Sequence, residues 1–248
     1  MQSNFLDYNI DFRNQKVSCP LSGGINSAAV LCTLALLPKE LQPEKLYIFY
    51  AHFVEHSKDT FKFVKACIRY ARLKFGHQNV VIKITRNSVN KWFIQEGWIP
   101  HPTKSPCSTK LKFEPLEKWL EQNDVDIDLI GYIRQESKRI KRQQKRVKDS
   151  DLSKIYPIAH LSESDCFALV KQEIGWYPAI YDIKDSNNKQ VFLHNNCLPC
   201  KNMSANQLDN VKTYYPEKWV KAKEVEEKTG SYWGRLPVIN QCDYCLFD

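Results

Sequence analysis

Hydrophobic residues in this chain form short continuous runs that alternate with amphipathic segments. The runs at residues 16–21 and 45–53 have the near-continuous hydrophobicity of strands that are buried on both faces. Residues 59–75 instead place apolar side chains at helical spacing. Because buried strands alternate with helices, the pattern predicts an α/β fold: a parallel sheet with helices on both faces.

The same alternation continues to about residue 182. Further strands are predicted at 80–84, 127–133 and 155–159, and further helices at 113–122 and after Ser162. Beyond that point the pattern weakens, and we expect loops, two helices and paired cysteines. The predicted organisation is an α/β domain over 1–185, followed by a C-terminal helical, cysteine-bearing extension over 186–248.

The turn after the first strand has the composition of a phosphate-binding loop. Residues 18–27 read Ser-Cys-Pro-Leu-Ser-Gly-Gly-Ile-Asn-Ser and run directly into an apolar helix. Gly23 and Gly24 allow the backbone to approach a ligand closely, and Ser22 and Ser27 offer hydroxyl donors. The amides of 23–27 lie at the positive end of the helix, which favours an anion. The alternative is a glycine-containing turn that binds no ligand.

This loop resembles the PP-loop of the adenine nucleotide α-hydrolase superfamily, and two later segments narrow the resemblance. Cys107-Ser-Thr-Lys-Leu-Lys opens a helix, and Gly131-Tyr-Ile-Arg-Gln-Glu-Ser-Lys-Arg leaves a strand. In this order, over about residues 16–203, the motifs resemble the phosphoadenosine phosphosulfate (PAPS) reductase family. The resemblance implies a PP-loop fold that binds ATP or another adenine nucleotide. The residues it places at the nucleotide are Ser22, Gly23, Gly24, Asn26, Ser27, Lys110, Arg134 and Arg139.

Two departures from the family pattern bear on the reaction. Related ATP-using enzymes carry Ser-Gly-Gly-x-Asp-Ser, whereas this chain has Asn26, which supplies no carboxylate to Mg²⁺. Sulfonucleotide reductases use a cysteine in a C-terminal Glu-Cys-Gly-Leu-His segment, and the tail here ends Gln241-Cys-Asp-Tyr-Cys-Leu-Phe-Asp. Adenylation with Mg²⁺ and simple reduction are therefore both open questions at the level of sequence.

Nine cysteines form the second chemical signal. In a reducing compartment they indicate a metal or catalysis more than disulfides. Two C-x-x-C pairs, Cys197/Cys200 and Cys242/Cys245, have the spacing with which two thiolates chelate one metal. The family resemblance implies that Cys107 joins a later pair in a [4Fe–4S] cluster with Cys197, Cys200 and Cys245, or Cys242 in place of Cys245. The alternative is Zn²⁺ on the two pairs.

Net charge and hydropathy limit the classes of partner that we expect for this chain. The chain has 36 basic and 28 acidic residues, a net charge of +8, which favours anionic partners. The basic run at 134–148 is interpreted as a solvated helix or loop, or as a contact for an anionic ligand or nucleic acid. No apolar run has the length of a membrane span, and the N-terminus does not resemble a signal peptide, so we expect a cytoplasmic protein without a membrane partner.

The resemblance implies an enzyme of sulfur chemistry, with an ATP-dependent sulfurtransferase as the first hypothesis. In that reaction a substrate oxygen attacks the α-phosphate of ATP, pyrophosphate leaves, and sulfur delivered through Cys107 or a cluster displaces AMP. The second hypothesis is a true PAPS reductase. The third is a nucleotide-binding or nucleic-acid-binding protein that kept the fold without catalysis.

Overall fold

A parallel five-stranded sheet forms the centre of the molecule. The computed structural model describes residues 11–101, 105–146 and 152–234. The strand order is β3-β2-β1-β4-β5, and every pairing is parallel. The strands are β1 (Lys16–Ser18), β2 (Lys45–Phe53), β3 (Val80–Asn87), β4 (Ile127–Leu129) and β5 (Ser153–Ile155). The predicted α/β fold with a parallel sheet is confirmed.

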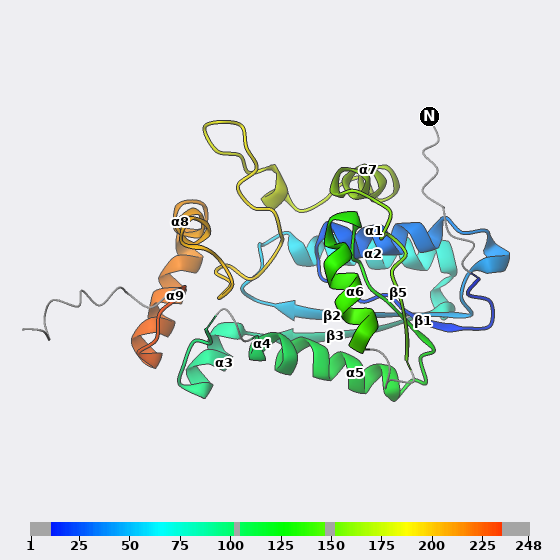
Figure 1. The fold of residues 1–248 in the computed structure, drawn as a ribbon, viewed down its shortest axis with the longest axis horizontal. Helices are drawn as coiled ribbons and strands as arrows, with labels where there is room; N and C mark the ends of the chain where they lie inside the picture. Colours follow the sequence, from blue (N-terminus) through cyan, green and yellow to red (C-terminus); the bar gives the residue numbers. More distant parts are fainter. Residues whose placement is uncertain (1–10, 102–104, 147–151, 235–248) are drawn as a thin grey trace, which may run out of the picture.

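Helices cover both faces of this sheet (Figure 1). On one side lie α1 (Ile25–Ala35), α2 (Thr60–Phe75) and α7 (Glu163–Ile174). On the other lie α3 (Val89–Glu96), α4 (Pro106–Ser108) and α5 (Glu114–Glu121). Trp119 of α5 packs its ring against Tyr47 and Phe49 of β2, with centroids 5.7 and 5.9 Å apart. Burial of such aromatic surface fixes the helix on the sheet.

Three more helices complete the described chain. They are α6 (Ser137–Arg146), which follows β4, and the C-terminal helices α8 (Ala205–Tyr214) and α9 (Pro216–Thr229). The ring of Trp233, just after α9, lies 5.4 Å from that of Phe93 in α3. This contact packs the C-terminal extension against the α/β core. Within the described ranges, no helix combines the length and hydrophobicity that crossing a membrane requires.

The strand order reverses at β1, which lies between β2 and β4. Ligands of open parallel sheets bind at the carboxyl ends of the strands where the order reverses. The segments that follow β1, β2 and β4 therefore meet at one edge of the sheet. These segments carry the glycine loop, Glu55 and the Gly131 motif.

Most predicted elements agree with the structure, and the differences have local causes. Ser162 is the N-cap of α7: its hydroxyl accepts from the amide of Asp165 at 3.2 Å. The predicted strand over 155–159 is wrong, because β5 ends at Ile155 and Pro157 has no N–H with which to continue a ladder. The strand predicted over 127–133 ends at Leu129.

Gly23 occupies a position that other residues would strain. Its φ is +81°, in the region that disfavours a side chain, and an added Cβ would lie 2.4 Å from Cγ2 of Thr60. Thr60 cannot yield easily, because it is fully buried and hydrogen-bonded to Ser57 at 2.8 Å. The glycine therefore lets the loop pack directly on the start of α2.

Gly23→Ala is expected to destabilise the fold more than Gly97→Ala. Gly97 has a similar φ of +76° but nothing within 4 Å of an added Cβ, so it isolates the backbone cost. We expect a loss of about 1 kcal/mol for Gly97→Ala and about 2 to 4 kcal/mol for Gly23→Ala, because overpacking adds to strain. Urea unfolding followed by circular dichroism measures both. Equal losses would show that the contact with Thr60 is not limiting.

Candidate functional site

The glycine loop is closed by its own serine hydroxyls. The Oγ atoms of Ser22 and Ser27 lie 3.0 Å apart, and the Ser22 amide donates to Ser27 Oγ at 3.0 Å. The Gly24 amide donates to Ser22 Oγ at 3.2 Å, and the Ser27 hydroxyl can donate to the Gly24 carbonyl at 3.0 Å. These contacts hold the hydroxyls and amides of the loop close together. The same groups are the donors that a phosphate oxygen would accept from.

The start of α1 is suited to an anion. Its N-cap is Gly24, which has no side chain to cap the helix, and the first turn carries no acidic residue. The Ile25 amide donates to the hydroxyl of Tyr181 at 3.4 Å. The other first-turn amides, including those of Asn26 and Ser27, have no partner within the helix. The positive end of the helix dipole is thus directed at the loop.

The segment after β4 packs tightly against this helix start. A Cβ added to Gly131 would lie 3.2 Å from the backbone carbon of Asn26 and 3.4 Å from the amide nitrogen of Ser27. Only a glycine permits this approach without displacement. The first and third sequence motifs are therefore in contact, as the carboxyl-edge argument requires.

Asn195 ties the cysteine-bearing segment to the loop. Its buried Nδ2 donates to the Gly23 carbonyl at 2.8 Å, and its Oδ1 accepts from the Thr60 hydroxyl at 3.1 Å. Its backbone amide donates to the Tyr181 hydroxyl at 3.3 Å, the same oxygen that accepts from Ile25. Cys197 lies two residues further along the chain. No sequence pattern marks Asn195, an isolated residue in a loop, or Tyr181, which lies in the short 3-10 helix Ala179–Asp182.

Three of the predicted metal-binding cysteines share one neighbourhood. Burial raises the pKa of Cys197 well above its usual value, and the nearby Cys200, Glu55 and Cys107 raise it further. Burial also raises the pKa of Cys107, which Lys201 opposes, and the pKa of Cys200. The Leu198 amide donates to the Glu55 carbonyl at 3.0 Å, which anchors the pair beside the end of β2. All three groups are therefore neutral thiols at neutral pH.

Two lysines accompany these thiols. Lys112 is half-buried, and burial lowers its pKa while Cys197 opposes that shift. Lys201 is 3% exposed, and its Nζ donates to the His101 carbonyl at 3.3 Å. Burial lowers the pKa of Lys201, and Cys107 and Cys200 oppose that shift. The site thus places cations where a thiolate or another anion would be stabilised.

The helical geometry explains which lysine meets the thiols. Residues Thr109–Phe113 form a π-helical turn between α4 and α5, and such turns rotate the side chains that follow. Lys112 is the lysine of this turn that interacts with Cys197. Lys110 instead pairs with Glu114, Nζ to Oε1 2.9 Å, on an exposed surface. Phosphate binding by Lys110 stays a prediction.

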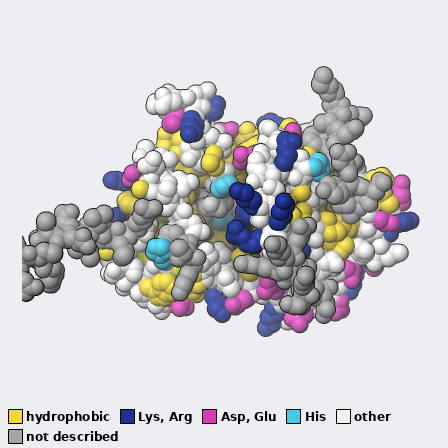
Figure 2. Space-filling model, viewed as in Figure 1, with side chains coloured by type: hydrophobic (Ala, Val, Ile, Leu, Met, Phe, Trp, Pro, Cys, Tyr) yellow, Lys and Arg dark blue, Asp and Glu magenta, His cyan; other side chains and the backbone are white. Residues whose placement is uncertain are grey.

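Arg134 and Arg139 lie on the basic side of the site. Figure 2 shows Lys and Arg side chains gathered over α6, the helix to which Arg139 belongs. Arg139 pairs with Glu136, and its guanidinium lies 4.6 Å from the ring centroid of Tyr132. Arg134 is exposed, and its amide donates to the Leu161 carbonyl at 3.0 Å. Contacts of either arginine with a ligand stay predictions.

The polar residues at the end of β2 have structural partners. The Glu55 carboxylate accepts from the Ser88 hydroxyl at 2.6 Å and from the amides of Val89 and Asn90, so it caps α3. The Tyr50 hydroxyl lies 3.3 Å from Nδ1 of His52 and 3.4 Å from Nδ1 of His56. Burial lowers the pKa of His56 to about 3, so that imidazole is neutral.

The thiols have the chemistry of a soft-metal site, but not its geometry. Thiolates bind zinc and iron–sulfur clusters. Across residues 11–101, 105–146 and 152–234, no three cysteine, histidine or acidic side chains converge closely enough to hold a metal ion. Cys242 and Cys245 lie outside the described residues. The three described thiols alone therefore do not make a metal centre.

Two solved structures are similar to this one at low sequence identity. The U34-tRNA thiolase NcsA of Methanococcus maripaludis, solved with its [4Fe-4S] cluster, is 16% identical, with a TM-score of 0.51. The alignment covers 92% of this chain and 76% of that one. The PAPS reductase of Candida auris, in complex with phosphate, is 13% identical over 70% of this chain and 83% of that one, with a TM-score of 0.44. At these identities the likeness shows the fold alone.

The sequence itself is matched by one family model. A search of curated proteins finds no significant match. The model of the phosphoadenosine phosphosulfate reductase domain matches residues 16–185, which include the glycine loop, the Cys107 segment and the Gly131 segment. This match spans well over half of the chain. The chain therefore belongs to the phosphoadenosine phosphosulfate reductase domain family.

Proposed function

We propose that this protein is an ATP-dependent sulfurtransferase that couples a nucleotide site at residues 22–27 to a thiol site at Cys107, Cys197 and Cys200. The supporting observation is the buried Asn195, which hydrogen-bonds the phosphate loop and lies two residues from Cys197. One side chain therefore joins the two sites structurally, and we expect a change at one of them to affect the other. The solved tRNA thiolase with this fold is an enzyme of the same reaction class.

The proposed reaction has two substitution steps. A substrate oxygen attacks the α-phosphorus of ATP, the bond to the β-phosphate oxygen breaks, and pyrophosphate leaves. A sulfur nucleophile at the oxidation level of sulfide, supplied as hydrosulfide, then attacks the activated carbon. The carbon–sulfur bond forms and the carbon–oxygen bond breaks as AMP leaves. Ser22, Ser27 and the first-turn amides would hold the phosphates and stabilise the charge that develops on them.

The site residues also bear on metals in this reaction. Because Asn26 offers no carboxylate, Mg²⁺ would be held by the nucleotide phosphates and water. Cys107, Cys197 and Cys200, with Cys245 as a fourth ligand, would hold a [4Fe–4S] cluster if they drew together, whereas Zn²⁺ would be held by the two pairs Cys197/Cys200 and Cys242/Cys245. Such a group would supply a sulfur-binding or structural centre. Lys112 and Lys201 would stabilise the negative charge of the thiolates.

Ser27→Ala is expected to weaken ATP binding, because this hydroxyl joins Ser22 to Gly24 in the loop. A loss of about 1 kcal/mol corresponds to one hydrogen bond. Calorimetric titration with ATP, AMP and PAPS measures it. Thr213→Ala, which removes a hydroxyl that donates to a carbonyl in exposed α8, is the matched control. Failure of all three nucleotides to bind wild type would refute the proposal, and binding of PAPS alone would favour a reductase.

Asn195→Ala is expected to lower both stability and ATP affinity. It leaves the buried Gly23 carbonyl without its donor and removes one of the hydrogen-bond partners of Thr60, which costs about 1 to 3 kcal/mol of unfolding free energy. Asn123→Ala is the control, since its Nδ2 donates to the Trp119 carbonyl at 2.7 Å, after α5 and away from the loop. That variant should lose stability and keep its ATP affinity. Unchanged ATP affinity in Asn195→Ala would disprove the coupling.

Metal bound by these thiols is expected to be lost as the pH falls. The pKa values of Cys107, Cys197 and Cys200 are raised, so each thiol must release a proton before it binds metal.

Iron and zinc analysis of anaerobically purified protein should find less metal in Cys107→Ser than in wild type. Cys166→Ser, in the buried core, is the control. Full occupancy in Cys107→Ser together with loss in Cys245→Ser would exclude Cys107 as a ligand.

A further inference from the structure

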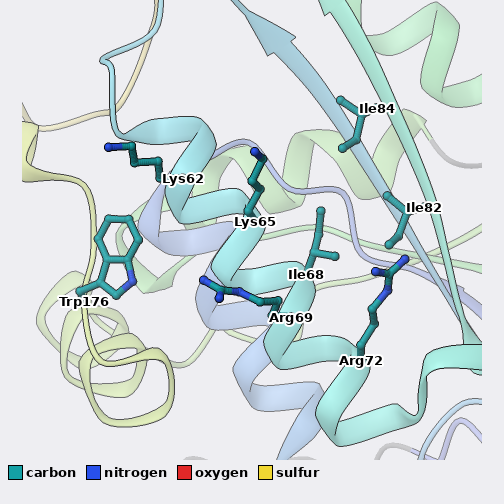
Figure 3. A pocket seen from close by; sticks show the side chains of 8 residues that line it. All are labelled: Lys62, Lys65, Ile68, Arg69, Arg72, Ile82, Ile84 and Trp176. Atoms are coloured by element: carbon teal, nitrogen blue, oxygen red, sulfur yellow. The ribbon is translucent and has the colours of Figure 1, made fainter.

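A groove outside the nucleotide and thiol sites passes over α2, from Trp176 on one side of the helix to Ile82 and Ile84 of the edge strand β3 on the other (Figure 3). Its volume is about 780 Å³. One side carries the cations Lys62, Lys65, Arg69 and Arg72 of α2. Because β3 is the last strand on its side of the sheet, Ile82 and Ile84 remain within reach of a partner.

The four cations form one row along the helix. They are three, four and three residues apart, which places them on one face over about 15 Å of helix axis. No acidic residue lines the groove, and none of the four pairs with a carboxylate in the described part of the chain. The Arg72 Nε is buried without a hydrogen-bond partner. The row is therefore a strip of uncompensated positive charge.

Apolar side chains lie beside this row. Ile68, Ile82 and Ile84 line the groove together with the indole of Trp176, and Ile84 is 41% exposed. Trp176 is half-buried and packs edge-on against Phe63, with centroids 5.5 Å apart. The indole is therefore held in place while it still borders the groove. A ligand that carries regular negative charge on one side and flat apolar groups on the other fits these two surfaces.

The groove begins beside the nucleotide site. Thr60, the first residue of α2, hydrogen-bonds Asn195, which in turn binds the Gly23 carbonyl. Lys62 belongs to the first turn of α2, and Figure 3 shows it at the same end of the groove as Trp176. A chain bound along the row would therefore have one end close to the phosphate loop.

We propose that this groove binds single-stranded nucleic acid, with phosphates along the four cations and a base against Trp176. The inference deepens the proposed function, on which it rests, by naming a nucleic acid as the sulfur acceptor. A phosphodiester chain carries one negative charge in every unit, which matches a continuous row of cations with no acidic interruption. The groove is separate from the basic helix α6, to which the sequence alone directs attention.

Fluorescence anisotropy with labelled single strands of about 20 nucleotides tests this inference, with RNA and DNA as separate arms. The double variant Lys65→Gln/Arg69→Gln is expected to bind about tenfold more weakly, and its salt slope should fall by about 1.4. The control Lys39→Gln/Lys118→Gln removes the same charge from exposed positions elsewhere and should change affinity less than about twofold. Trp176→Leu should lose about fivefold or more through the stacked base.

Calorimetric ATP titration of the same preparations separates the two proposals. Wild type that binds ATP but neither RNA nor DNA overturns the groove assignment and leaves the proposed function standing. Absence of ATP binding overturns the proposed function itself. Equal losses in the groove and control variants would show diffuse electrostatics instead of a site. Displacement of the oligonucleotide by polyglutamate as readily as by unlabelled RNA would identify an acidic protein surface as the partner.

Discussion

The buried amide of Asn195 is the interaction on which the arrangement of this site depends. The glycine loop, with Gly23 at φ +81°, turns its carbonyl inward, and that carbonyl must find a donor because buried polar groups are costly without partners. Asn195 supplies the donor and binds Thr60 with the same side chain. This one residue links the loop after β1, the start of α2 and the segment that carries Cys197 by hydrogen bonds.

Much of the fold could be predicted because its signals are local. Continuous apolar runs identified β2, and the strand–glycine–helix sequence identified the loop and α1. The position of Lys112 could not be predicted, because a π-helical turn changes the direction of side chains in a way that residue types do not encode. The role of Asn195 could not be predicted either, because its hydrogen-bond partner lies 172 residues away in the chain. The division of the chain at residue 185 stays a prediction.

The two basic regions illustrate the same limit. The run at 134–148 is conspicuous in sequence because its charges are closely spaced, and α6 exposes Lys138, Arg139, Lys141 and Arg142. The row on α2 is dispersed among the apolar residues that hold the helix on the sheet, so it reads as an ordinary amphipathic helix. The row lines a groove because β3 is an edge strand and because Trp176 lies beside α2. Spatial context, more than charge density, distinguishes the two.

Burial and the neighbouring lysines have opposite effects on the protonation of the thiols. Burial favours the neutral thiol at Cys107, Cys197 and Cys200, and it also lowers the pKa values of Lys112 and Lys201. A buried lysine and a buried thiol each favour the charged form of the other, so neither gains its full stabilisation while the thiols remain protonated. Formation of a thiolate, or binding of an anionic sulfur species, would satisfy both groups at once. Lys112 and Lys201 therefore favour negative charge at the thiols, and the proposed reaction would bring an anionic sulfur species there.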